Sequence, residues 1–140
     1  MLTAFREEVQ CLLVEGVNIM IFMATQRRNF TEDEINAVWD KASKQPSNNP
    51  DVFRKDYAGA WIRREDYGKR DKSYGWEIDH LKPLAKDGTY DIDNLYPVHW
   101  KNNEKKGDDY PRWKTAISSE GNKNIELEQK WKVDDTLCIE

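Results

Sequence analysis

The chain has only two histidines, His80 and His99, and both lie among carboxylates and amides. His80 directly follows Asp79, and Asn94 and Asn103 come after it at spacings of 14 and 23 residues. Carboxylate and amide oxygens are hard ligands that suit Mg²⁺ or Mn²⁺, and an imidazole can take a proton from water near neutral pH. Hydrolysis of a phosphodiester requires such a base, a metal ion and nearby cations. These residue types therefore indicate phosphodiester chemistry.

The elements that would position these residues can be read from the sequence on either side of them. Residues 76–81 alternate as a strand does, and residues 95–98 read as a second strand that Pro97 confines to a sheet edge. Residues 99–106 have helix composition, and Gly107 ends them. The predicted order is strand, loop, strand, helix. Neighbouring residues of a strand point to opposite faces, so a bend at the strand end is needed to bring Asp79 and His80 to one ion.

With these residues at these spacings, residues 74–108 resemble the HNH endonuclease family, in its small single-domain prokaryotic or phage type. The family's Asp-His pair falls on Asp79 and His80, its middle Asn on Asn94 and its last ligand on Asn103. The lysine and glycine that trail the family motif fall on Lys106 and Gly107. The resemblance implies the ββα-metal (His-Me finger) fold for this segment. With the N-terminal helix and extra short strands that the sequence pattern predicts, the expected fold class is α+β.

The resemblance also implies a role for each matched residue. His80 is expected to be the general base that activates water, and Asp79 and Asn103 to hold one divalent ion, Mg²⁺ or Mn²⁺. Asn94 is expected to hydrogen-bond across the loop and hold His80 in line. The implied reaction is hydrolysis of DNA, leaving 5′-phosphate and 3′-hydroxyl ends.

Two departures from the family pattern affect this interpretation. The last ligand position is Asn103 rather than histidine, and the Cys-x-x-Cys pairs that hold structural zinc in many members are missing, so no structural zinc is expected. His99 lies four residues before Asn103, which on a helix permits metal contact. A structural or phosphate-contacting role for His99 is favoured over ligation. Asn102 is expected to face solvent or cap the helix, and Glu77 to be a solvated strand residue or a further ligand.

The charges of the chain are unevenly distributed. The net charge is −4, which excludes a broadly basic protein that coats nucleic acid. Residues 54–72 nevertheless carry a net +3 and residues 101–114 a net +2, on either side of the motif. A positive rim around an acidic metal site is what phosphate binding requires. The expected nucleic-acid contacts are Arg63, Arg64, Lys69, Arg70, Lys101, Lys105 and Lys106.

Length predicts a single domain over residues 1–140, and the resemblance implies that it is an HNH nuclease domain. Its parts would be an N-terminal extension or helix at 1–30, a helix at 31–43, the ββα-metal motif at 74–108, and a C-terminal hairpin and tail at 109–140. A T-x-x-E capping box, Thr31 to Glu34, marks the start of the second part. Met23 is a hypothetical alternative start of translation.

Other functions stay open at this point. The same motif could serve as a non-catalytic ββα module that binds nucleic acid or acts as an adaptor, and the same site chemistry could act on RNA. The apolar run 11–24 is too short and too interrupted to span a membrane, so no membrane partner is expected. The absence of a recognisable signal peptide and the two unpaired cysteines favour a cytoplasmic location. The oligomeric state is left open.

Overall fold

The computed structural model of the chain describes residues 28–133. Met23, most of the predicted N-terminal segment and both cysteines lie outside the described residues. From Glu32 onward the described residues belong to one compact unit. None of the described helices is long and apolar enough to cross a membrane.

The first helix of this unit is α2 (Glu32–Trp39), and it is shorter than the predicted helix at 31–43. Its buried residues follow helical spacing and lie on one face: Ile35, Val38 and Trp39. Beyond Trp39 the amides of Lys41 and Ala42 bond to carbonyls only three residues back, which tightens the last turn. Ser43 then pairs with Lys55 as an isolated β-bridge, so the chain has already left the helical path.

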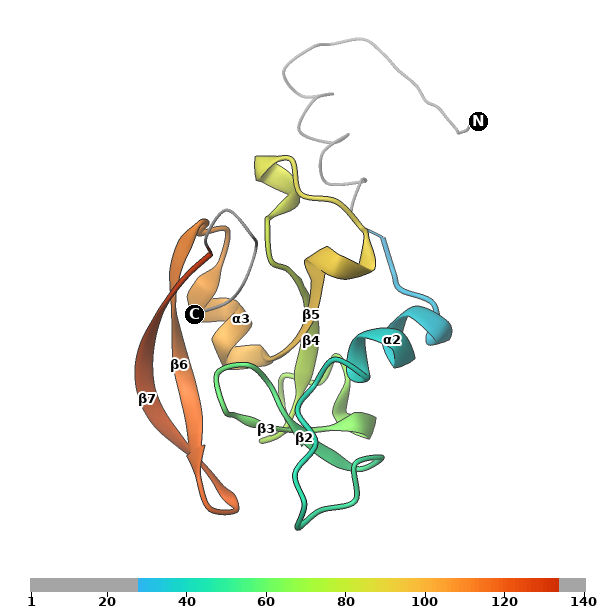
Figure 1. The fold of residues 1–140 in the computed structure, drawn as a ribbon, viewed down its shortest axis with the longest axis vertical. Coiled ribbons are helices and arrows are strands. Elements are labelled where there is room, and N and C mark those ends of the chain that lie inside the picture. Colours follow the sequence, from blue (N-terminus) through green and yellow to red (C-terminus); the bar gives the residue numbers. More distant parts are fainter. Residues whose placement is uncertain (1–27, 134–140) are drawn as a thin grey trace, which may run out of the picture. The chain divides into compact units, whose positions relative to one another are not determined.

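After α2, residues 28–133 form three antiparallel two-stranded sheets (Figure 1). They are β2 (Phe53–Lys55) with β3 (Trp61–Arg63), β4 (Trp76–His80) with β5 (Leu95–His99), and β6 (Arg112–Glu120) with β7 (Lys123–Lys132). Helix α3 (Trp100–Lys106) follows β5 directly. Single 3₁₀ turns lie at Arg64–Asp66, Leu84–Lys86 and Ile92–Asn94. The predicted α+β class and the ββα order β4, β5, α3 are confirmed.

The ββα unit forms for the local reasons that the sequence indicates. Strands β4 and β5 pair in a five-residue register that runs from Trp76 opposite His99 to His80 opposite Leu95. The His99 ring accepts a hydrogen bond from the Lys101 amide at the start of α3, as a helix cap does. The helix ends at Gly107, whose φ of 55° suits a residue without a Cβ.

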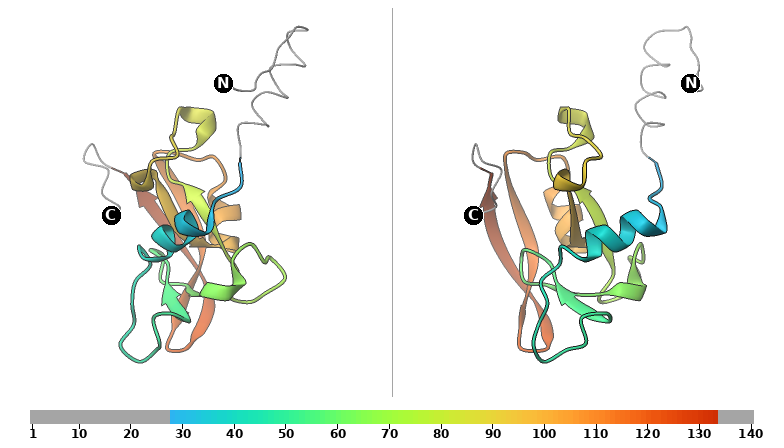
Figure 2. Two further views of the ribbon diagram at one scale, coloured as in Figure 1. Left: turned by 90° about the vertical axis from the view of Figure 1, so that its right-hand side faces the viewer. Right: turned by 45° about the vertical axis from the view of Figure 1, so that its right-hand side comes forward.

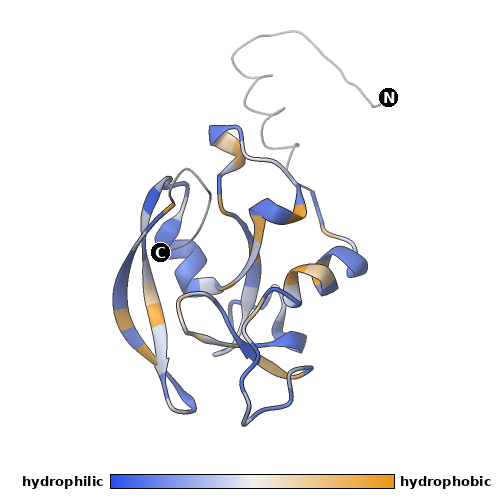
Figure 3. Ribbon diagram, viewed as in Figure 1, coloured by the Kyte–Doolittle hydropathy of each residue, from blue (hydrophilic) through white to orange (hydrophobic). Residues whose placement is uncertain are grey.

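The β6–β7 hairpin lies within the predicted hairpin and tail at 109–140, and it packs against α3. Figure 2 shows from two further sides that the hairpin runs along the flank of the unit where α3 lies. Its inward residues Trp113, Thr115 and Ile117 are buried. Helix α3 itself carries no strongly hydrophobic stretch (Figure 3), so the hairpin covers a helix whose buried side is polar.

Tryptophan supplies much of the core. Trp39, Trp61, Trp76 and Trp113 are all buried, so these four of the six tryptophans serve packing. Trp76 is fully buried and packs against the ring of Trp39 at 5.2 Å between centroids. A second cluster joins Leu81, Trp113 and Val133, with Trp131 and three tyrosines around it. This second cluster fixes the chain immediately after His80.

Candidate active site

The last two residues of β4, Asp79 and His80, lie against the end of α3. Both side chains are buried, at 6% and 8% exposed. The Lys106 ammonium lies 3.4 Å from the Asp79 carboxylate and donates a hydrogen bond of the same length to the His80 carbonyl. Lys106 therefore ties the helix to both residues at once.

This placement corrects the expectation that Lys106 contacts nucleic acid. Lys106 is 1% exposed, so it does not belong to a surface rim. It lies four residues after the fully buried Asn102, on the same face of α3, while Lys101 and Lys105 are exposed. The hairpin covers this face, and the Lys106 ammonium lies 5.4 Å from the Trp113 ring centroid.

Asn94 closes the loop that leaves β4. Its side-chain oxygen accepts the Lys82 amide at 2.8 Å, and its side-chain nitrogen donates to the carbonyls of Lys82 and Thr89 at 3.0 and 2.8 Å. Its backbone carbonyl accepts the Leu81 amide at 2.8 Å. Asn94 thus holds the two residues after His80. A side chain at Gly88 would strike the Lys82 carbonyl, which explains a glycine in this closed loop.

The ring of Tyr90, on the same loop, contacts His80. The two rings meet edge to face, with centroids 4.6 Å apart and planes at 90°. The contact restricts how the His80 ring can turn. Sequence reasoning does not single out Tyr90, because a tyrosine in a polar loop carries no local signal of its neighbour.

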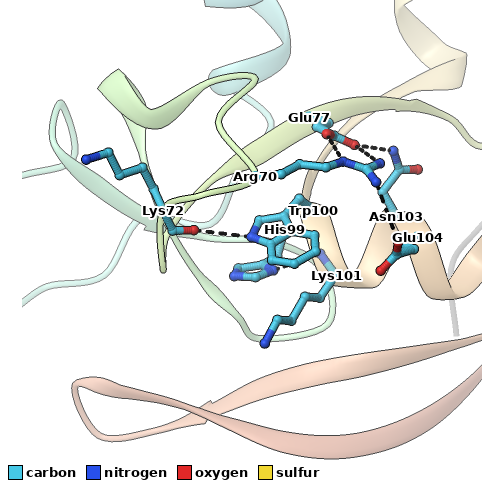
Figure 4. A network of polar contacts seen from close by, with 8 residues as sticks. All are labelled: Arg70, Lys72, Glu77, His99, Trp100, Lys101, Asn103 and Glu104. Carbon is cyan, nitrogen blue, oxygen red and sulfur yellow. Dashed lines mark hydrogen bonds and ion pairs between the residues drawn. The ribbon is translucent and has the colours of Figure 1, made fainter.

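Asn103, the expected last ligand, is engaged by Glu77 of β4 (Figure 4). The Asn103 amide nitrogen donates to Glu77 at 2.8 Å, and Arg70 donates twice to the same carboxylate at 2.6 and 2.9 Å. Burial alone would raise the pKa of Glu77, but these hydrogen bonds hold it below its usual value. Glu77 is therefore neither a merely solvated residue nor placed as a free ligand: it binds two neighbouring side chains.

The comparisons with known proteins bear on this segment. Residues 67–109 match the family model described as HNH endonuclease. This segment is therefore similar to an HNH endonuclease domain. The match includes all four residues Asp79, His80, Asn94 and Asn103 and confirms the resemblance predicted for residues 74–108. Neither the comparison with curated proteins nor the comparison with solved structures gave a match.

Within the matched segment, the surroundings of His99 do not suit metal contact. It is 2% exposed; one ring nitrogen is 2.9 Å from the Ser73 carbonyl, and the other accepts the Lys101 amide at 3.1 Å. Since the nitrogen near Lys101 is an acceptor, the proton lies on the nitrogen that donates to Ser73. Burial lowers the pKa of His99. Both ring nitrogens therefore serve the fold, which is the structural role favoured for His99 over metal ligation, and neither nitrogen is left to hold a metal.

A buried carboxylate outside the HNH match, Asp56, organises the same end of the domain. Its two oxygens accept four hydrogen bonds, from the amides of Ala58, Ala60 and His99 and from the Asn102 side chain. Burial raises the pKa of Asp56 to about 6, although these hydrogen bonds oppose the rise. The sequence Asp56 to Gly59 is a typical turn signal, but it does not reveal the partners beyond the turn.

Asn102, expected to face solvent or cap the helix, is fully buried instead. Its oxygen accepts the amides of Ala116 and Ile117, and its nitrogen donates to Asp56 and to the Ile117 carbonyl. Asn102 thereby joins α3 to β6.

The other expected nucleic-acid contacts lie on the surface, but several are bound to carboxylates. Arg64 contacts Glu32 at 2.8 Å and Arg70 contacts Glu77, which satisfies much of their charge within the fold. Lys69 and Lys101 are exposed. Arg63 pairs with Glu65, and Lys105 lies 3.8 Å from Glu128.

The oxygen donors of the matched segment are of a type that suits a hard divalent cation. Among residues 28–133 no group of three or more His, Cys, Asp or Glu side chains is arranged to hold a metal. Asp79 and Asn103 would instead supply one carboxylate and one amide oxygen, since the Asn103 nitrogen is already bound to Glu77. Mg²⁺ suits such a set because it keeps several waters and takes few protein ligands.

Proposed function

We propose that this protein is a metal-dependent HNH endonuclease that hydrolyses DNA phosphodiester bonds. The observation that carries the proposal is the place of the Asp79-His80 pair, at the end of β4 and against α3, inside the segment that matches the HNH family model. Residues 81–94, closed by Asn94, follow this pair directly. A histidine at the end of a supported strand is suited to general-base chemistry.

The residues that would hold the cation are Asp79 and Asn103. When bound, the ion would supply positive charge to the scissile phosphate and to the leaving 3′ oxygen. Glu77 orients Asn103 by binding its amide nitrogen, which leaves the amide oxygen as the available ligand atom. The product ends implied by the family are 5′-phosphate and 3′-hydroxyl.

In the proposed mechanism His80 takes a proton from the attacking water. Two contacts position it for this step: the edge of Tyr90 restricts the ring, and Lys106 binds the His80 carbonyl. Asn94 acts one residue further along, on the backbone of Leu81 and Lys82, and so fixes the path of the chain rather than the ring itself.

Nicking of a supercoiled plasmid tests the proposal. The wild type and His80→Ala are each incubated with Mg²⁺ or Mn²⁺, and circular dichroism is used to confirm that both are folded. We expect nicking by the wild type and a loss of nicking in the variant. Equal cutting by both proteins would refute the assignment of His80.

Parallel substrates decide between the proposal and its alternatives. Single-stranded DNA, duplex DNA and RNA of one sequence are offered under the same conditions. Cleavage of RNA in preference to DNA would show that the proposed substrate should be RNA instead of DNA. Binding of duplex without any cleavage, with or without metal, would favour the non-catalytic module.

A further inference from the structure

The outward face of the β6–β7 hairpin carries cations at the end away from its turn. Strand alternation sends Trp113 and Thr115 of β6 into the interior, and on β7 the half-buried Gln129 and Trp131 alternate with exposed lysines. The exposed residues are all basic here. We use the name hairpin cation cluster for Arg112, Lys114, Lys130 and Lys132, together with Lys105 of α3.

The register of the hairpin sets these like charges directly opposite one another. Arg112 pairs with Lys132, and Lys114 pairs with Lys130. Like charges at opposed positions of an antiparallel pair destabilise a sheet. The arrangement therefore opposes hairpin stability, and packing on the inward face does not require it, because the four side chains point away from the core.

Anions do little to neutralise this cluster. Within residues 28–133 the carboxylate that forms ion pairs with it is Glu128, which lies 3.5 Å from Lys114 and 3.8 Å from Lys105. The turn end of the same hairpin differs, because Lys123 there faces Glu120 across the strands. Cations are thus sorted to one end of the hairpin in a chain whose net charge is −4.

The end of the hairpin that carries the hairpin cation cluster lies close to the candidate active site. Trp113 and Val133, the chain neighbours of Arg112 and Lys132, pack against Leu81, which directly follows His80. Figure 1 shows the start of β6 and the end of β7 together, beside α3. A polyanion held at His80 could therefore continue along the end of the hairpin.

We propose that the hairpin cation cluster binds the phosphate backbone of the nucleic-acid substrate outside the cleavage site. This inference rests on the proposed nuclease function. Four of the five cations, all except Lys105, lie outside the residues 67–109 that match the family model. Lysine and arginine contacts to phosphate provide affinity without reading sequence. An anionic membrane is a poorer match, because Leu127 is the one large hydrophobic residue that the described part of the hairpin exposes.

Salt-dependent binding of a 30-base-pair duplex tests the cluster. The measurement is fluorescence anisotropy of a labelled duplex, with His80→Ala as the parent protein so that cleavage does not intervene. The test variant adds Arg112→Gln and Lys132→Gln, which removes one opposed pair. The control adds Lys44→Gln and Lys123→Gln, both exposed and outside the cluster, with the same change in net charge.

We expect weaker binding by the test variant and a slope of log Kd against log salt that is smaller by about two, because two phosphates are no longer neutralised by the protein. The control should keep the parent slope to within about one half. The melting temperature of the test variant should be equal to or above that of its parent, because a repulsive pair has been removed.

Each further outcome has a defined meaning. Equal slopes for the test and control variants would overturn the cluster as a binding surface, even if the wild type cuts DNA. Binding of phosphatidylserine vesicles in place of duplex would also overturn it. Cluster-dependent binding by a protein that never cleaves would retain the surface and reject the nuclease.

Discussion

The two ends of the β4–β5 ribbon each carry a histidine, yet the two side chains have different surroundings. At one end, His99 gives both ring nitrogens to backbone groups of Ser73 and Lys101. At the other end, His80 meets the edge of Tyr90, and its neighbour Asp79 lies beside Lys106. The ribbon is one continuous ladder, so strand geometry is the same at both ends.

The two ends of the ribbon differ in what their polar side chains bind. We call the end at His99 the structural end and the end at His80, where the proposed chemistry lies, the chemical end. Around His99, the buried groups Asp56 and Asn102 satisfy backbone amides from three separate elements, so this end connects the fold. Around His80, side chains hold the backbone of the strand end and the loop, through Lys106 and Asn94. The first arrangement stabilises the domain, whereas the second fixes the end of β4, where Asp79 and His80 follow each other in the chain.

The largest expected effect comes from truncating each histidine in turn. His80→Ala should lower the cleavage rate by about 10²–10⁴-fold while the protein stays folded, because a general base contributes that much. His99→Ala should lower the free energy of unfolding by about 2–4 kcal/mol, since it removes a helix cap and a buried partner of Ser73. Specific activity and urea unfolding are measured for both. Equal losses of activity per folded molecule in the two variants would contradict the different roles of His80 and His99.

The next effect is expected at the chemical end, from Lys106→Met. This change leaves the buried Asp79 without its nearby cation, and removal of one partner of a buried pair costs about 3–5 kcal/mol of unfolding free energy. Urea unfolding measures the loss. Lys105→Met, on the exposed side of the same helix, is the control and should change stability by about 0.5 kcal/mol or less. Similar losses in both variants would contradict the buried pair.

A pH series tests the structural end through Asp56→Asn. Because the pKa of Asp56 is raised to about 6 in the fold, its protonation favours the folded state. That contribution is complete below the ordinary value of 3.8 and is lost as the pH rises through about 6. The advantage of wild type over the variant should therefore shrink by up to about 3 kcal/mol between pH 4 and pH 7. A gap that widens over this range would contradict the assignment.

The smallest expected effect concerns Glu77, which connects the ribbon to Asn103. Glu77→Ala should weaken Mn²⁺ binding, measured by calorimetry, by about 10-fold to 100-fold, because the Asn103 amide loses the partner that orients it. Glu104→Ala is a matched control, since Glu104 contacts Arg70 in the same network but is not the partner of Asn103. An unchanged affinity in Glu77→Ala, or an equal loss in the control, would remove Glu77 from this role.

Local sequence signals account for the elements of the domain. Alternation of residues predicts β4, and Pro97 marks β5 as an edge strand. Gly107 ends α3 at the position that the sequence predicts. A local signal also determines the start of α2, whereas a contact with a distant part of the chain determines its end. The helix stops at Trp39 because Ser43 pairs with Lys55, a strand contact that no helical pattern contains.

The polar interior is the part that local signals miss. Asn102 and Lys106 share a face of α3 with helical spacing, but no hydrophobic residue marks that face as buried. This face of α3 is buried only because β6, from a later part of the chain, packs against it. The hairpin cation cluster is hidden for the same reason. Its members come from a segment with net positive charge and from the segment after Lys114, which has net negative charge, and the strand register brings them together.

The pairing of Lys106 with Asp79 bears on whether folding or metal binding comes first. A buried carboxylate that waits for a metal ion would hinder folding until the ion arrived. Here Lys106 of α3 brings a cation to that carboxylate, so folding would not depend on the proposed ion. In the proposed nuclease, folding would come first and cation uptake second, and chelation is expected to stop cleavage reversibly without unfolding the protein.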